Sequence, residues 1–139
     1  MKTIQKIVVI LSAVLIFYGY IYSQESKYIP KESLVKKAYE ICSVSLNSEI
    51  QGIVETSIYN VILIKKYYPS AKYSSIIDKL NEIAEENIDP SIRFKAHLAS
   101  VYLNFSDIIS IEPAFNIYDR EYIFKQITAQ LEKNLLVSN

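Results

Sequence analysis

The chain has 139 residues, and its 15 lysines and arginines balance 15 aspartates and glutamates. This length suffices for one domain with a single core, while the neutral charge and the lack of a basic cluster argue against a nucleic-acid partner. The single cysteine, Cys42, excludes an internal disulfide. Cys42 lies on the apolar face of an expected helix, so we interpret it as a small core residue and not as a nucleophile.

The N-terminal segment has the pattern of a secretory signal peptide. Two lysines precede an apolar run over residues 7–22, and the small residue Ser23 follows at a suitable cleavage position. The run is shorter than the ~18–20 residues that cross a bilayer. We therefore expect a signal peptide over 1–23, a single mature domain over 24–139 and a periplasmic or secreted location. The alternative is that the N-terminal segment stays as an uncleaved anchor, and membrane contact is expected only in that case.

The scarcity of glycine and proline indicates helices joined by short turns. The chain has 2 glycines and 4 prolines, and its apolar residues recur at helical spacing. Pro30 suits the first turn of a helix, and Ser48 with Gln51 forms the Ser-x-x-Gln pattern of a capping box. Tyr68-Pro69 marks a helix end. We therefore expect the first three mature helices over about 30–46, 48–68 and 70–86.

The dipeptide Asp89-Pro90 is the clearest helix start in the chain. Aspartate can cap free amide groups while proline occupies the first helical position, which predicts a fourth helix that continues to about Phe105. Residues 106–118 are expected to form a loop. Asp119 then caps a last helix, whose apolar stripe consists of Ile123, Phe124, Ile127 and Leu131.

The first four mature helices repeat with a period of about 42 residues. When residues 34–63 are shifted forward by this period, apolar residues fall on apolar residues; Leu34 falls on Ile76, and Val61 on Leu103. Each unit contains two expected helices, which is typical of helical-hairpin solenoids. The pattern therefore predicts two similar helical hairpins.

Residues 76–103 resemble a HEAT repeat. The resemblance is carried by Asp89-Pro90-Ser91-Ile92-Arg93 and by the following residues Ala96, Ala99 and Leu103. It implies that Asp89 in the turn and Arg93 in the helix help to tie successive repeats together. The preceding unit departs from this pattern, since Asn47 stands where Asp89 would be and Gln51 where Arg93 would be.

The resemblance implies an all-α fold, a short right-handed HEAT-like stack of two hairpins. Two repeats are fewer than the three or more that a solenoid needs to bury its faces. We therefore expect the last helix to cap the open end of the second repeat. The alternative is that a partner protein or a homodimer supplies the missing layer.

The second helix of each hairpin carries a further apolar strip. In the fourth helix this strip lies nearly opposite the core stripe, and a helix that is apolar on two sides is either sandwiched or exposes one face to a ligand. We therefore predict an exported, non-enzymatic module that binds a protein or peptide and needs no cofactor or metal. A purely structural alternative is that residues 106–118 cover the strip. The candidate contacts are Tyr59, Leu63, Phe94, His97, Val101 and Phe105.

A small envelope enzyme or enzyme subunit is the alternative function. Its pocket would lie beside His97 and the turn that contains Glu85, Glu86 and Asp89. Such an enzyme needs a concave pocket in which the histidine meets a carboxylate within hydrogen-bond reach. A single histidine without nearby cysteines or paired carboxylates is a poor metal site.

Overall fold

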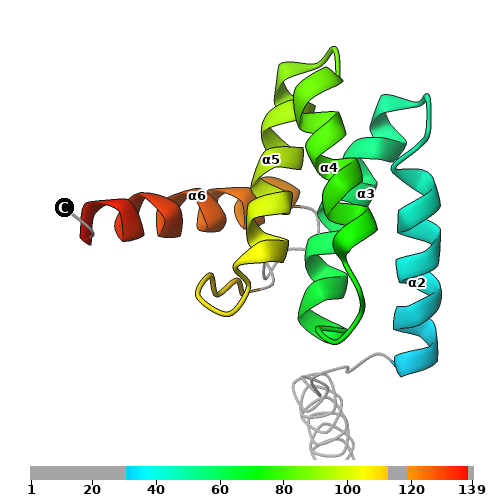
Figure 1. The fold of residues 1–139 in the computed structure, drawn as a ribbon, viewed down its shortest axis with the longest axis horizontal. Helices are drawn as coiled ribbons and strands as arrows, with labels where there is room; N and C mark the ends of the chain where they lie inside the picture. Colours follow the sequence, from blue (N-terminus) through cyan, green and yellow to red (C-terminus); the bar gives the residue numbers. More distant parts are fainter. Residues whose placement is uncertain (1–30, 113–118, 138–139) are drawn as a thin grey trace, which may run out of the picture.

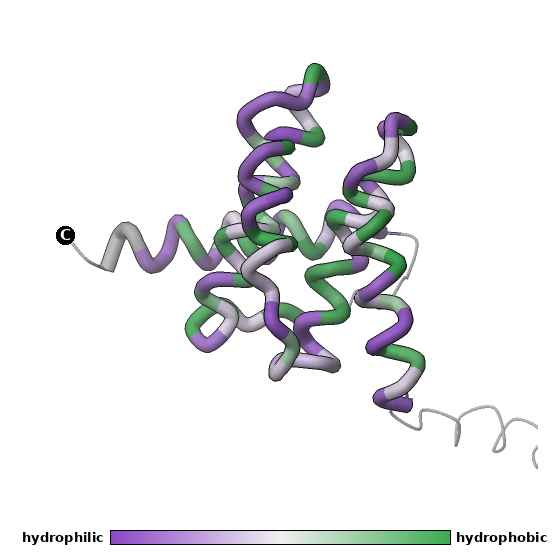
Figure 2. The backbone as a smooth tube through the Cα atoms, turned by 45° about the vertical axis from the view of Figure 1, so that its right-hand side comes forward, coloured by the Kyte–Doolittle hydropathy of each residue, from purple (hydrophilic) through white to green (hydrophobic). Residues whose placement is uncertain are grey.

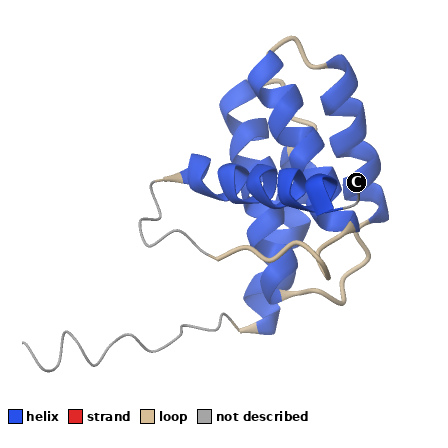
Figure 3. Ribbon diagram, turned by 90° about the vertical axis from the view of Figure 1, so that its left-hand side faces the viewer, coloured by secondary structure: helices blue, strands red, loops and turns tan. Residues whose placement is uncertain are grey.

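The computed structural model describes residues 31–112 and 119–137, so the predicted signal peptide lies outside the described residues. Within these ranges the secondary structure is helical, with no strand, which confirms the all-α prediction (Figure 3). No helix among them is long and apolar enough to cross a membrane. The helices are α2 (Glu32–Ser45), α3 (Gln51–Tyr67), α4 (Ser74–Glu86), α5 (Pro90–Asn104) and α6 (Arg120–Val137).

Two of the predicted helix caps are confirmed. The Asp89 carboxylate accepts a hydrogen bond from the Ser91 backbone N–H at 2.8 Å, and Pro90 is the first residue of α5. The Asp119 carboxylate accepts from the Tyr122 N–H at 3.2 Å at the start of α6. Side chains that satisfy the first amides stabilise a helix start, so these starts depend on local chemistry.

The predicted capping box before α3 is wrong. The helix begins at Gln51, and Ser48 Oγ accepts from the Ile50 N–H at 3.1 Å before the helix starts. Gln51 does not reach back to the serine, because its side-chain oxygen accepts from Asn87 Nδ2 at 2.9 Å. A tertiary contact thus takes the glutamine that the box would have used.

The helix α4 begins at Ser74, later than expected from the sequence. The turn before it is held by the Tyr73 hydroxyl, which donates to the Tyr68 carbonyl at 2.8 Å. The Tyr73 ring also packs edge-to-face with the ring of Tyr39 on α2, with ring centres 5.5 Å apart. Burial and the neighbouring tyrosines raise the Tyr73 pKa above its ordinary value.

The helices pack as two hairpins that meet through their second members. Helix α2 packs on α3, α4 packs on α5, and α3 packs on α5 (Figure 1). Hydrophobic and hydrophilic residues alternate along the helices (Figure 2), as expected for amphipathic helices with one face in a core. Among these four helices, α2 and α5 lie on opposite sides of α3 (Figure 1).

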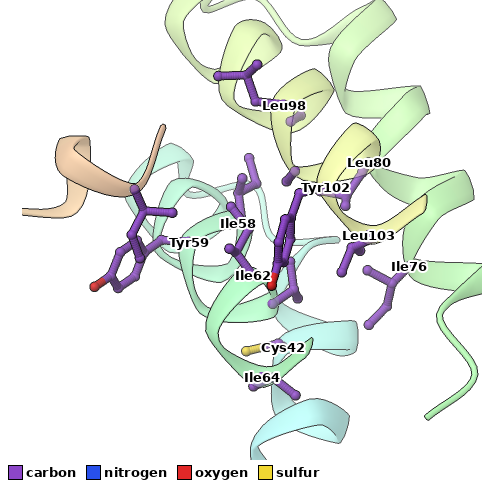
Figure 4. Packing of buried hydrophobic residues seen from close by; sticks show 14 of the residues in the cluster. Cys42, Ile58, Tyr59, Ile62, Ile64, Ile76, Leu80, Leu98, Tyr102 and Leu103 are labelled. Carbon is purple, nitrogen blue, oxygen red and sulfur yellow. The ribbon is translucent and has the colours of Figure 1, made fainter. Parts of the chain in front are cut away.

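The core is centred between α3 and α5. Ile58 and Ile62 of α3 are fully buried, and Tyr102 and Leu103 of α5 lie beside them (Figure 4). Burial raises the Tyr102 pKa above its ordinary value. Cys42 is 5% exposed and has a pKa that burial raises, although a hydrogen bond with Asn60 opposes this shift. The prediction that Cys42 is a core residue is therefore confirmed.

The last helix packs on α5 of the second hairpin, and its first residues also contact α3 of the first hairpin. Its apolar stripe faces the core, since Ile123, Phe124 and Ile127 are buried and Leu131 is partly buried against them. At its start, Arg120 donates to Thr56 Oγ1 of α3 at 2.8 Å, while the helix also packs on α5. Figure 3 shows α6 running across the direction of the other helices.

The described part of the 106–118 loop is held along α6 by two glutamine side chains. Gln126 and Gln130 each accept from one backbone N–H and donate to the carbonyl of the same residue, Glu112 and Ser110 respectively. Each amide therefore pairs with the backbone as a neighbouring strand would. Lys66 of α3 donates to the Ile111 carbonyl at 3.2 Å, so this segment also reaches the end of α3.

Candidate functional site

The outer side of α5 carries an apolar strip, which we call the α5 strip and define as Phe94, Val101 and Phe105. Phe94 is 54% exposed and Phe105 is 50% exposed, while Val101 between them is partly buried against the core. The strip lies roughly 180° around the helix from the core stripe that begins at Ile92. His97 is exposed on the same outer side. Four of the six predicted contacts therefore share one side of α5.

The predicted contacts from the first hairpin do not join the α5 strip. Tyr59 on α3 is only 8% exposed, and the guanidinium of Arg120 lies 5.7 Å from its ring centre. Figure 4 shows that Tyr59 projects from a different side of α3 than Ile62. Leu63 is partly buried and packs against the core. The expectation that Tyr59 is a surface contact is corrected: the start of α6 covers it, and it belongs to the core.

The structural alternative, in which the 106–118 loop covers the strip, does not hold for the described part of that loop. Ile109 and Ile111 are buried, but the segment runs along α6 and toward the end of α3. It leaves about half of Phe94 and Phe105 in solvent. Residues 113–118 lie outside the described ranges.

An ion cluster around a buried lysine, which sequence reasoning missed, joins three helices. Lys95 of α5 is only 7% exposed, and its ammonium donates to the carboxylates of Glu55 on α3 and Glu121 on α6. Burial acts to lower the Lys95 pKa, but the hydrogen bonds and charges of Glu121 and Glu55 outweigh it and raise the pKa above its ordinary value. On a helical projection, Lys95 lies beside the core stripe of α5. This position on the helix was the sequence signal that could have identified Lys95 as a buried residue.

The turn before α5 links the two hairpins through a residue that the resemblance did not indicate. Asp89 caps its own helix, and the Arg93 guanidinium donates to the backbone carbonyl of Asn87 at 2.7 Å. The contact with the first hairpin is made by the Asn87 side chain, which donates to Gln51. Arg93 therefore supports the link by holding the turn, and Asn87 makes it.

An open groove of about 420 Å³ lies between α2 and α4. Its lining contains no histidine or cysteine, and Lys79 and Glu82 in it pair with each other. The other carboxylate of the lining is Asp78, so the groove contains serines and carboxylates but no histidine to activate a serine as a nucleophile. The lining consists of Ser43, Leu46, Asn47, Ser75, Ile76, Asp78, Lys79 and Glu82.

The arrangement required for the enzyme alternative is not found among the described residues. His97 is exposed and forms no ion pair with Glu85, Glu86 or Asp89 there. In the same part of the chain, no three His, Cys, Asp or Glu side chains gather as metal ligands would. The geometry of His97 therefore gives the enzyme alternative no support.

Comparisons of the chain with protein-family models, with curated proteins and with solved structures find no match in any of the three. The resemblance of residues 76–103 to a HEAT repeat therefore stays a prediction. Among the described residues, the α5 strip exposes two large aromatic side chains to solvent.

Proposed function

We propose that this chain is a non-enzymatic interaction module that binds a protein or peptide partner through the α5 strip. The observation that carries the proposal is the exposure of two large aromatic side chains on the outer side of α5, Phe94 within the helix and Phe105 at its C-cap. Isolated exposed apolar side chains are common, but a grouped patch marks an interaction surface. Aromatic residues are also enriched in protein interfaces, where they bury much area.

The α5 strip is preformed on a well-supported helix. Ala96 and Ala99 are fully buried on the opposite side of α5, which allows α4 to approach closely. Ser100 Oγ donates to Asn81 Oδ1 of α4 at 2.6 Å and joins the two helices further. A partner that binds a rigid helix does not have to supply the free energy of ordering it, so even a small strip can contribute to affinity.

In this proposal the two hairpins are HEAT-like repeats in a short right-handed stack. The 42-residue register of the sequence supports this, as does the equivalent pairing of α2 with α3 and of α4 with α5. In such a stack, the outer side of α5 is the place where a further repeat would pack. An apolar strip at that position follows from the architecture, and a partner would take the place of the absent repeat.

The proposed site of action lies outside the cytoplasm. The support is the basic and apolar pattern of the first 23 residues. Intact-mass measurement of the protein isolated from its native envelope tests this proposal. Removal of residues 1–23 is expected, and their retention would replace secretion with membrane anchoring.

The binding proposal is tested by affinity capture from a native envelope extract. The variant Phe94→Asp/Phe105→Asp places charges on the α5 strip at exposed positions, so helical circular dichroism should not change. Tyr122→Asp is the matched control, because Tyr122 is 43% exposed on α6 and lies outside the strip. We expect the wild type and the control to recover the same partner and the double variant to lose it. Equal recovery by all three proteins would reject the α5 strip as the binding surface.

A further inference from the structure

A short segment of the loop after α5 has the side-chain pattern of an extended peptide. We call residues 109–112 the bound segment. Ile109 and Ile111 are 1% and 5% exposed and belong to the apolar core, while Ser110 and Glu112 are exposed. In an extended chain, successive side chains point to opposite faces. The bound segment therefore has one face on the core and the other in solvent.

Side chains of α6 hold the backbone of the bound segment along one edge. The side-chain amide of Gln130 accepts from the Ser110 N–H at 2.9 Å and donates to the Ser110 carbonyl. The side-chain amide of Gln126 accepts from the Glu112 N–H at 2.9 Å and donates to the Glu112 carbonyl at 2.8 Å. Each glutamine thus makes the pair of hydrogen bonds that a residue of a neighbouring strand would make.

The two glutamines are spaced to match alternate residues of an extended chain. Residues four apart on a helix are separated by about 6 Å along its axis, and residues two apart in an extended chain by about 6.6 Å. On the other edge of the segment, the Lys66 ammonium of α3 donates to the Ile111 carbonyl at 3.2 Å. These contacts are all made to backbone atoms of the segment, so they do not depend on which side chains it exposes to solvent.

This arrangement is how proteins bind extended peptides, where main-chain hydrogen bonds give affinity and pockets for alternate side chains give specificity. We propose that Gln126, Gln130 and Lys66 form a peptide-binding site, and that the bound segment is its built-in occupant. The ligand is an extended segment of a partner protein, with isoleucine or valine at two alternate positions. The built-in occupant keeps the site closed until the partner segment displaces it. This site is distinct from the α5 strip and does not depend on the function proposed for it.

The hydrogen bonds of the bound segment allow such an exchange. The four bonds made by the glutamines are at exposed positions, where water can replace them, and local opening of such a segment costs less free energy than global unfolding. Its attachment to α5 and α6 gives the segment an effective concentration on the order of 1 mM. A free peptide that buries two aliphatic side chains should have a dissociation constant on the order of 100 µM. The closed site should therefore bind it roughly 10-fold more weakly than an open one.

Fluorescence anisotropy with a labelled synthetic peptide of residues 107–112 tests this inference. The variant Ile109→Ser/Ile111→Ser of the full protein removes the apolar anchors of the built-in occupant, and we call it the open variant. We expect the open variant to bind the peptide with a dissociation constant on the order of 100 µM, and the wild type roughly 10-fold more weakly. A peptide with aspartate in place of both isoleucines should bind neither protein.

Two further variants separate the glutamine contacts from a general effect of charge. In the open variant, Gln126→Glu/Gln130→Glu should weaken binding about 10-fold or more, because a carboxylate cannot donate to the peptide carbonyls. The matched control is Lys125→Gln/Lys133→Gln in the open variant, which lowers the net charge by the same amount at exposed positions of the same helix. This control should bind the peptide as the open variant does.

Failure of the folded open variant to bind the peptide would overturn the inference, as would equal binding by the glutamate variant. If the open variant loses its helical circular dichroism, nuclear magnetic resonance of the wild type decides. Millimolar peptide should then shift the side-chain amide signals of Gln126 and Gln130, and unchanged signals would overturn the inference. A wild type that forms a dimer in sedimentation velocity, and loses it on Gln126→Glu/Gln130→Glu, would assign the site to a second copy and so overturn a separate partner.

Discussion

The Lys95 cluster predicts an unequal response to the removal of its positive and its negative members. Lys95→Met keeps the apolar stem and leaves Glu55 and Glu121, whose side chains are 42% and 56% exposed and can be rehydrated. Glu55→Gln/Glu121→Gln instead leaves an ammonium group on a side chain that is 9% exposed. An unpaired buried charge costs more free energy than an unpaired exposed one. The double glutamine variant should therefore be the less stable protein.

The size of each effect follows from the exposure of the partners. For Lys95→Met, two partly exposed ion pairs account for roughly 0.2–1 kcal/mol each. The contact of the ammonium with the Phe124 ring, at 5.7 Å, adds about 0.5 kcal/mol, so we expect a loss of about 1–2 kcal/mol. For the double glutamine variant we expect the free energy of unfolding to fall by about 2–4 kcal/mol. This loss is smaller than the cost of breaking a fully buried ion pair, because the glutamine side-chain oxygens still accept hydrogen bonds from Lys95.

Urea unfolding followed by circular dichroism measures both losses, provided that the m-values agree. Lys79→Met is the matched control, because it removes a lysine from a partly exposed i,i+3 pair with Glu82 and should cost less than about 0.5 kcal/mol. If Lys95→Met destabilises the protein as much as the double glutamine variant or more, burial of the ammonium is not what makes the cluster sensitive, and the reasoning is refuted.

Three further predictions concern the backbone, the core and the response to pH. Gly52→Ala should raise the free energy of unfolding by about 0.5 kcal/mol, because an added Cβ meets no atom within 4 Å. A lower free energy of unfolding in urea would contradict this. Ala99→Leu should cost about 1–3 kcal/mol through overpacking, since Ala99 is fully buried, and a variant with wild-type stability would show that α4 can move away freely. Burial raises the pKa values of Cys42, Tyr73 and Tyr102, so the folded state retains these protons longer than the unfolded state. The contribution of these three groups to stability is complete below their ordinary pKa values of 9.0 and 10.0 and is lost as pH rises. The free energy of unfolding should therefore fall above about pH 9; a free energy of unfolding that stays constant up to about pH 11 would argue against this.

Helix starts with strong local chemistry could be predicted from the sequence. Asp89 and Asp119 cap the helices that follow them because the carboxylate and the amides it accepts from lie within three residues. The box at Ser48 failed although its pattern was equally clear. Gln51 found a partner in Asn87, on the turn before α5, and a local pattern contains no information about such a competitor.

The candidate site was predicted only in part for a related reason. The α5 strip was correctly placed opposite the core stripe, because the angular spacing along a helix is set by its geometry. Tyr59 occupies the position that corresponds to Val101 in the other hairpin, yet it is buried. Its surroundings depend on Arg120 and α6, which are distant in the sequence.

The sequence by itself determined that this chain is helical, approximately where its helices lie and that α5 is apolar on two sides. These properties depend on residues within about one turn of each other, where caps and periodicity act. The tertiary structure alone decided which apolar surfaces are covered. The path of α6 across α3 and α5 buries Tyr59, pairs Glu121 with Lys95 and leaves Phe94 and Phe105 exposed. The physical reason is that a buried surface needs a covering element, and many pairings of the same amphipathic helices satisfy the local pattern equally well.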